Sequence, residues 1–125
     1  MASGDVVTHV RPAERVEADP TAGVTRERAI ETEGLWAGVA RTEPGSVTGW
    51  HHHGEYQTSI YVVSGQFRLE SGPGGHEVID ATPGDFLHLP AGVIHRESNP
   101  GAEESSIVVV RAGHGPPTIN VEGPA

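Results

Sequence analysis

The fold is decided by two stretches of the chain, GSVTGWHHHGEYQTSIYVVSG at residues 45–65 and GDFLHLPAGVIHRESN at residues 84–99. Each combines short apolar runs with Gly- or Pro-containing turns, a pattern typical of β-strands joined by tight connections. The first stretch carries three consecutive histidines, His51 to His53, and the second carries His95 beyond a proline-glycine turn. The segments that set the architecture therefore also carry a candidate site.

Strand geometry separates the three consecutive histidines. Successive strand residues point to opposite faces, so His51 and His53 share one face, with Cα atoms roughly 6.5 to 7 Å apart, and His52 points away. Two imidazoles at that separation can tilt toward one ion at the usual His–metal distance of about 2.0–2.1 Å. This geometry makes His51 and His53 candidates for one metal site and His52 the least suited of the three. A consecutive triplet can also be a solvated turn or a chance enrichment.

Strand patterns extend over most of the chain. The 17 glycines and 10 prolines favour short strands and tight turns over long helices. Within residues 25–40 the glycines weaken a helix, while Leu35, Ala37 and Val39 alternate at strand spacing. The expected strands are 6–10, one within 25–40, 47–53, 58–64, 66–70, 77–80, 86–89, one from residue 93, and 105–111. The last is almost continuously β-branched, which predicts burial on both faces.

One domain accounts for these strands. A chain of 125 residues with 35% apolar content is long enough for one hydrophobic core. We expect an N-terminal arm at residues 1–24, an all-β domain at 25–115 and a C-terminal tail at 116–125. Short strands at close spacing are typical of a small barrel or a double-sheet jelly roll.

Composition excludes several functions. The formal charge is −9 and all 8 basic residues are arginine, so a nucleic-acid or anionic-membrane surface, which needs a basic patch, is not expected. The absence of cysteine and lysine removes disulfides, thiolate nucleophiles and Schiff bases. No apolar run approaches the length of a membrane span and no signal peptide is visible, so we expect a cytoplasmic protein.

The two stretches resemble the two sequence motifs of the cupin superfamily. The matched positions are Gly45, His51, His53 and Gly65 in the first motif and Gly84, Pro90, Gly92, His95 and Asn99 in the second. The resemblance implies a single-domain, all-β jelly-roll barrel in which His51, His53 and His95 hold one divalent metal ion. A set of histidines suits Fe, Zn, Ni, Cu, Co or Mn, and the sequence does not choose among them.

The fourth ligand position departs from the motif. Cupins usually carry a glutamate seven residues before the closing glycine, and Thr58 stands there. Gln57 is adjacent and is considered as the fourth ligand, with Glu55 or water as the alternatives. If no carboxylate binds, a three-histidine site leaves the ion its full charge and raises its preference for an anionic, chelating ligand.

Other side chains receive weaker interpretations. Tyr56, Gln57 and Tyr61 are candidates for assisting proton movement, although tyrosine in strands mainly reflects its fit to a half-buried sheet. His88 is interpreted as structural. Arg96 and Glu97 follow the third histidine; Arg96 alternates away from His95 and is interpreted as a surface charge.

Three functions fit this interpretation, and one of them is a cupin that keeps its metal ligands only as structural residues. The first is a metal-dependent enzyme, a dioxygenase-like oxidoreductase, an isomerase or a lyase, acting on a small organic acid or an enolisable carbonyl compound. Some cupin dioxygenases, including thiol and β-diketone oxygenases, have three-histidine iron sites. The second is a non-catalytic cupin that binds a metal or a small ligand, since the fold does not settle function. Cupins commonly form homodimers, and residues 35–40 are the expected contact.

Restoring the motif glutamate tests the fourth position. If Thr58 faces the ion, Thr58→Glu adds a charged oxygen ligand and should tighten divalent-metal binding, measured by competition with a chromophoric chelator. Unchanged affinity would show that this position does not face the ion.

Overall fold

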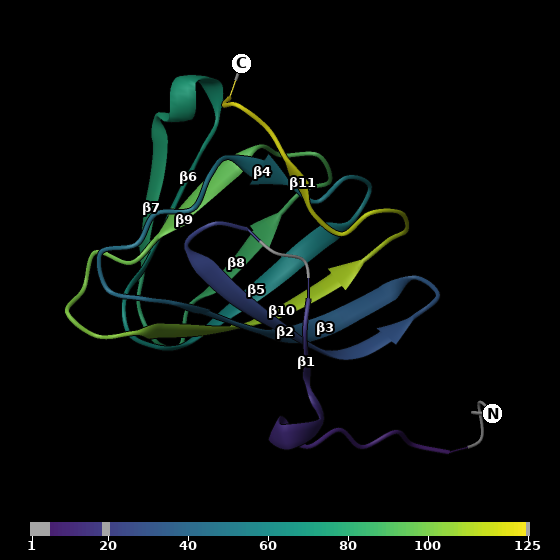
Figure 1. The fold of residues 1–125 in the computed structure, drawn as a ribbon. Coiled ribbons are helices and arrows are strands. Elements are labelled where there is room, and N and C mark those ends of the chain that lie inside the picture. Colours follow the sequence, from purple (N-terminus) through teal and green to yellow (C-terminus); the bar gives the residue numbers. More distant parts are fainter. Residues whose placement is uncertain (1–5, 19–20, 125) are drawn as a thin grey trace.

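The computed structural model describes residues 6–18 and 21–124, which form two antiparallel sheets (Figure 1). The strands are β1 (Val16–Glu17), β2 (Val24–Thr32), β3 (Leu35–Thr42), β4 (His51–His52), β5 (Gln57–Ser64), β6 (Phe67–Ser71), β7 (Glu77–Ala81), β8 (Phe86–Leu89), β9 (His95–Ser98), β10 (Ser105–Ala112) and β11 (Ile119–Asn120). Two 3-10 turns are η1 (Pro12–Glu14) and η2 (Pro73–Gly75). No helix in this part of the chain is long and apolar enough to cross a membrane.

The strand order shows repeated crossing between the sheets. One sheet has the order β1-β2-β3-β10-β5-β8 and the other β11-β4-β9-β6-β7. The prediction of a single-domain, all-β jelly roll is confirmed, although the described strands form two separate sheets and not one closed barrel. Residues 6–15 run away from both sheets in Figure 1, whereas the C-terminal segment returns to pair β11 with β4.

The hydrophobic core lies between the sheets. On β5, Thr58, Ile60 and Val62 are buried and alternate with exposed residues. Phe67 and Leu69 of β6 are buried on the inner side of the other sheet. Full burial of each large apolar side chain stabilises the fold by about 1.5–3 kcal/mol. The same alternation decides which polar side chains point into the interior.

The expectation that the last long strand is buried on both faces is wrong. Ile107 and Val109 of β10 are buried, but Val110 is 38% exposed. An antiparallel sheet packed on a second sheet has only one covered face, and β-branched residues on its outer face still favour the strand. Apolar composition therefore indicated the strand but not its burial.

Some predicted strand boundaries also differ. Residues 6–10 form no strand. The expected strand at 47–53 is reduced to β4, and before it Val47 forms only an isolated bridge with Ser98. Residues 25–40 are extended as predicted, but a turn at Gly34, where φ is +93°, divides them between β2 and β3.

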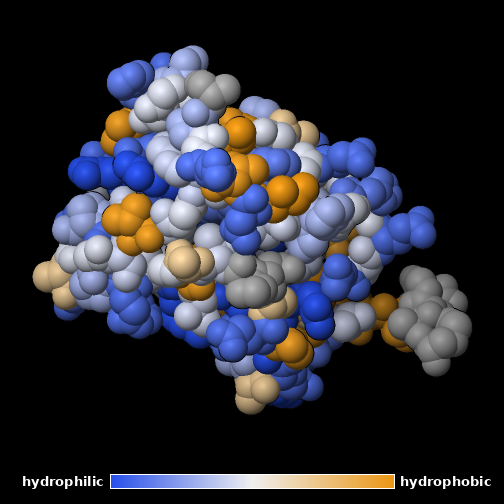
Figure 2. Space-filling view, turned by 45° about the horizontal axis from the view of Figure 1, so that its top comes forward, coloured by the Kyte–Doolittle hydropathy of each residue, from blue (hydrophilic) through white to orange (hydrophobic). Residues whose placement is uncertain are grey.

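The surface seen in Figure 2 is largely hydrophilic, with hydrophobic residues in small separate groups. Within the stretch expected to form a dimer contact, Leu35 is 38% exposed whereas Trp36 and Ala40 are buried. Only alternate residues of that stretch are therefore available to a partner. The homodimer stays a prediction.

The buried side chain of Asn99 holds the loops at one end of the sheets together. Its Nδ2 donates to the carbonyls of Thr42 (2.9 Å) and Glu103 (2.7 Å), and its Oδ1 accepts from the Gly101 amide (2.9 Å). Asn99→Ala removes three hydrogen bonds and should lower the free energy of unfolding by about 2 to 4 kcal/mol in urea denaturation. Asn120→Ala, at an exposed asparagine of β11, should stay within about 0.5 kcal/mol of the unsubstituted protein, and equal effects of both variants would contradict this account.

Candidate metal centre

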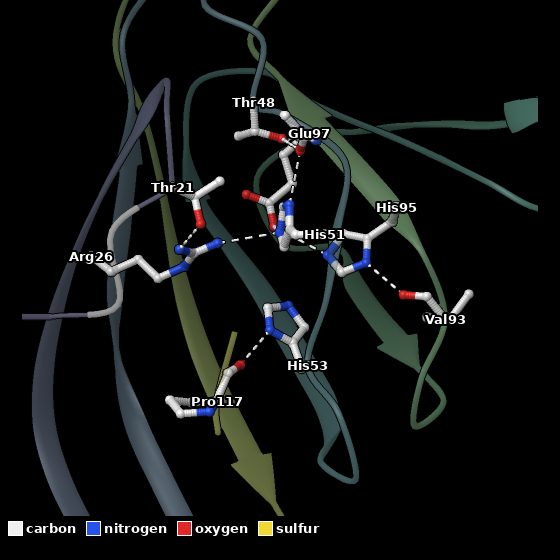
Figure 3. A network of polar contacts seen from close by, with 10 residues as sticks. Thr21, Arg26, Thr48, His51, His53, Val93, His95, Glu97 and Pro117 are labelled. Carbon is white, nitrogen blue, oxygen red and sulfur yellow. Dashed lines mark hydrogen bonds and ion pairs between the residues drawn. The ribbon is translucent and has the colours of Figure 1, made fainter. Parts of the chain in front are cut away.

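Four buried side chains converge between the sheets: His51, His53, His95 and Glu97. One nitrogen or oxygen from each lies within 4.8 Å of the others. The ring centroids of His51 and His95 are 4.3 Å apart, and those of His53 and His95 are 4.9 Å apart. Figure 3 shows the three rings and the carboxylate directed toward one another.

The pairing of β4 with β9 brings these residues together. His51 and His95 are direct partners in the antiparallel register, so their side chains share the inner face. Glu97 lies two residues beyond His95 on β9 and therefore points the same way. His53 follows β4 and is buried, whereas the His52 ring turns aside and accepts a hydrogen bond from the Gly54 amide.

Backbone carbonyls orient all three rings. The Nδ1 atom of His51 lies 2.9 Å from the Gly49 oxygen, that of His95 lies 3.0 Å from the Val93 oxygen, and that of His53 lies 2.7 Å from the Pro117 oxygen. A carbonyl only accepts, so each Nδ1 is the protonated nitrogen that donates. The neutral tautomer then leaves each Nε2 with a lone pair, and such carbonyl partners typically fix metal-binding histidines.

The inner ends of these side chains are acceptors that face one another. The Glu97 Oε1 atom lies 3.8 Å from His51 Nε2 and 3.7 Å from His95 Nε2, which is too long for a hydrogen bond. Buried His95 Nε2 and Glu97 Oε2 have no hydrogen-bond partner among the described residues. Buried acceptors without donors are costly unless a cation satisfies them. Three imidazole nitrogens and one carboxylate are therefore a set of ligand atoms that fits a divalent transition metal.

Neighbouring charges keep the Glu97 carboxyl ionised. Burial by itself raises its pKa, but the contacts with His51 and His95 and the positive charge of Arg26 outweigh burial and hold the pKa well below its usual range. Metal binding requires neutral imidazoles, so the carboxylate would be the one negatively charged ligand of the cluster. That charge favours binding of a cation.

His53 is held neutral. Burial, followed by the positive charge of Arg111 and the neighbouring His95, lowers the pKa of His53 to about 2. Its Nε2 lone pair is therefore available to a metal at any pH at which the protein functions. Metal binding at this residue does not have to displace a proton.

The other sequence candidates lie elsewhere. Thr58 is buried and faces the interior, where its Oγ1 has no partner among the described residues, and it is the register partner of Arg111. Gln57 was the candidate fourth ligand, but it alternates with Thr58 on β5, lies exposed and contacts His88 Nε2 at 3.2 Å. Tyr61 also faces outward, against the Phe86 ring.

The remaining candidates have structural environments. Tyr56 is a buried core residue, and Glu55 is exposed. Arg96 points to the outer face, where it pairs with Glu70 at 2.9 Å and stacks on the Trp50 ring. Its interpretation as a surface charge agrees with this placement.

Sequence reasoning missed the carboxylate. Glu97 stands beside His51 and His95, where Gln57 was considered, and the signal that identifies it is the strand alternation that linked His51 to His53. The carboxylate is thus supplied from β9 and not from β5. Nothing in the sequence around Arg26 or Pro117 indicated that these residues contact the cluster.

A family model described as a cupin domain matches residues 38–111. The chain is a cupin. No relative was found among functionally curated proteins. The matched residues include all four side chains of the cluster.

Solved structures of other cupins show the same fold at low sequence identity. The polyketide cyclase RemF from Streptomyces resistomycificus has a TM-score of 0.75 and 21% identity, covering 93% of this chain and 86% of RemF. An uncharacterised Klebsiella pneumoniae protein with a double-stranded β-helix domain has a TM-score of 0.74 and 24% identity, covering 98% of both chains. Bacillus subtilis oxalate decarboxylase, with Mn(II) centres, has a TM-score of 0.70 and 18% identity over 86% of this cupin and 29% of the decarboxylase.

Burial of neutral His53 predicts that acid destabilises the protein stripped of metal. Between pH 6.5 and about 2 the unfolded chain binds a proton at this residue and the folded chain does not, so stability rises with pH across this window. His53 alone should make the protein about 2 kcal/mol less stable at pH 5 than at pH 7 in urea denaturation with a chelator. The loss between pH 7 and pH 5 should be smaller in His53→Gln, and an equal loss in both proteins would contradict the assignment.

Proposed function

We propose that this cupin holds one divalent transition metal between His51, His53, His95 and Glu97 and acts as a metal-dependent enzyme. The observation that carries the proposal is the shared orientation of the rings. All three Nδ1 atoms are committed to backbone carbonyls, so all three Nε2 lone pairs are directed into the cluster with the carboxylate. Four protein ligands leave two positions of an octahedral ion for a substrate.

Charge supports a small anionic substrate. A divalent ion with one carboxylate ligand keeps a positive charge. The buried guanidiniums of Arg26 and Arg111 add to it, since the first acts on Glu97 and the second on His53. A buried site of net positive charge is stabilised by an anion that also coordinates the ion. When bound, the ion would supply Lewis-acid polarisation of substrate oxygens.

The substrate class is a small organic acid or an enolisable carbonyl compound, bound through two oxygens. Two structural neighbours are named polyketide cyclase and oxalate decarboxylase, and both names fit this class. The reaction is that of a dioxygenase-like oxidoreductase, an isomerase or a lyase. A site with three histidines and Glu97 does not select among these three reactions.

The alternative is metal or ligand binding without catalysis. It is supported by the outward placement of Gln57 and Tyr61, which removes two of the side chains considered for proton movement. The metal site is common to both proposals. Turnover separates them.

Metal content tests the shared part of the proposal. Protein purified without chelators should contain about one transition-metal ion per chain by elemental analysis, and Glu97→Gln should weaken metal affinity by at least about tenfold. Glu70→Gln is the matched control, because Glu70 lies on the adjacent strand but pairs with Arg96 on the outer face. No stoichiometric metal, with no uptake on reconstitution, would overturn the proposal.

Screening for turnover then separates enzyme from binder. Protein loaded anaerobically with Fe(II), and separately with Mn, Co, Ni, Cu or Zn, is tested against small dicarboxylates, diketones and thiols for oxygen consumption and for product. Turnover that is lost in Glu97→Gln supports the enzyme. Silence with every metal, in protein that retains the ion, supports the binder.

A further inference from the structure

A buried arginine from the opposite sheet reaches the cluster. Arg26 lies on β2 and is 2% exposed. Its Nη1 atom donates to Thr21 Oγ1 at 2.6 Å, and its Nη2 atom lies 3.3 Å from His51 Nε2. Figure 3 shows the guanidinium extending from the side of β2 toward the His51 ring, with the Thr21 hydroxyl next to it.

The contact uses the lone pair that a metal would use. His51 Nδ1 donates its proton to the Gly49 carbonyl, so Nε2 is the acceptor for Arg26. An imidazole nitrogen has one lone pair in the ring plane, which either accepts a hydrogen bond or binds a metal. Arg26 therefore opposes metal binding at His51 twice, as a competing donor and as a like charge.

A cavity of about 350 Å³ lies against the same arginine. It is lined by Glu17, Ala18, Val24 and Arg26. Arg26 therefore both lines this cavity and contacts His51.

An anion resolves the opposition between the arginine and the ion. A carboxylate has two oxygens, so one can accept from the guanidinium while the other coordinates a cation. The negative charge of an anion between them would offset the repulsion between the guanidinium and the ion. Metal and anion then each strengthen the binding of the other, and the coupling is reciprocal.

We propose that Arg26 makes this centre selective for a small carboxylate anion that bridges the metal ion and the guanidinium, and that Arg26 couples the binding of the two. This inference rests on the proposed metal site and identifies the residue that recognises its substrate class. Thr21 is a positioning residue, because it holds Nη1 and so directs Nη2 toward the cluster.

Cobalt and formate test the coupling without any need for turnover. The dissociation constant of Co(II) is measured from its visible absorption with and without saturating formate, and formate is titrated into Co(II)-loaded protein. Formate should tighten Co(II) binding by roughly tenfold in the unsubstituted protein, with the same factor for formate in the presence of Co(II). No coupling in the unsubstituted protein would overturn the inference.

Arg26→Met removes the charge at nearly constant length. This variant should bind Co(II) alone more tightly than the unsubstituted protein, because the competing donor and the like charge are gone, and it should lose the effect of formate. The matched control is Arg68→Met, which breaks an exposed pair with Asp80 and should change neither quantity. A merely structural role for Arg26 predicts weaker Co(II) binding with the formate effect retained, which would contradict the inference.

Two further variants keep the test decisive if Arg26→Met does not fold. Arg26→Lys retains the charge but loses the forked donor, so it should keep part of the coupling. Thr21→Val frees Nη1 and should reduce the coupling less than Arg26→Lys does. Full coupling in both would overturn the inference, whereas failure of the unsubstituted protein to bind Co(II) would overturn the metal site itself.

Discussion

The antiparallel pairing of β4 with β9 is the constraint on which the site depends. It places His51 opposite His95, and strand alternation then puts His53 and Glu97 on the same inner face. The two strands come from segments separated by β5, β6, β7 and β8, so the jelly-roll crossings are needed to bring them together. A shift of either strand by one residue would turn its ligands to the outer face.

The charges at the site depend on the burial of its side chains between the two sheets. Burial lowers the pKa of His53 and keeps its ring neutral. Carbonyl partners select the tautomer with inward lone pairs in all three rings. The one carboxylate, Glu97, gives the cluster affinity for a cation. Arg26 and Arg111 come from the opposite sheet, and their positive charges act on Glu97 and His53 respectively. In our proposal Arg26 limits the affinity for the ion unless an anion accompanies it. Selectivity for a metal-anion pair is therefore a property of the two facing sheets together.

Local pattern was sufficient for most of the strands, but not for residues 6–10 or for the length of β4. The resemblance to the second family motif identified His95, and alternation paired His51 with His53. The same rule identifies Glu97, but the search for a carboxylate was confined to the neighbourhood of Thr58, where the motif usually has it. Gln57 was considered because it is near in sequence, and its alternation with Thr58 places it outside.

Strand alternation and motif spacing could not predict contacts between distant segments of the chain. The hydrogen bond from His53 to the Pro117 carbonyl joins residues separated by 64 positions, and the contact between Arg26 and His51 joins residues separated by 25. Both depend on how one sheet packs on the other and on where the C-terminal segment returns. Within the C-terminal tail expected at residues 116–125 lie β11 and the Pro117 carbonyl, which accepts a hydrogen bond from the His53 ring.

Anomalous diffraction from a crystal of the cobalt-loaded protein tests the central claim most directly. We predict one strong peak between the sheets, about 2.0–2.2 Å from the Nε2 atoms of His51, His53 and His95 and from a Glu97 oxygen. A peak elsewhere, or no peak within reach of these four side chains, would contradict the account.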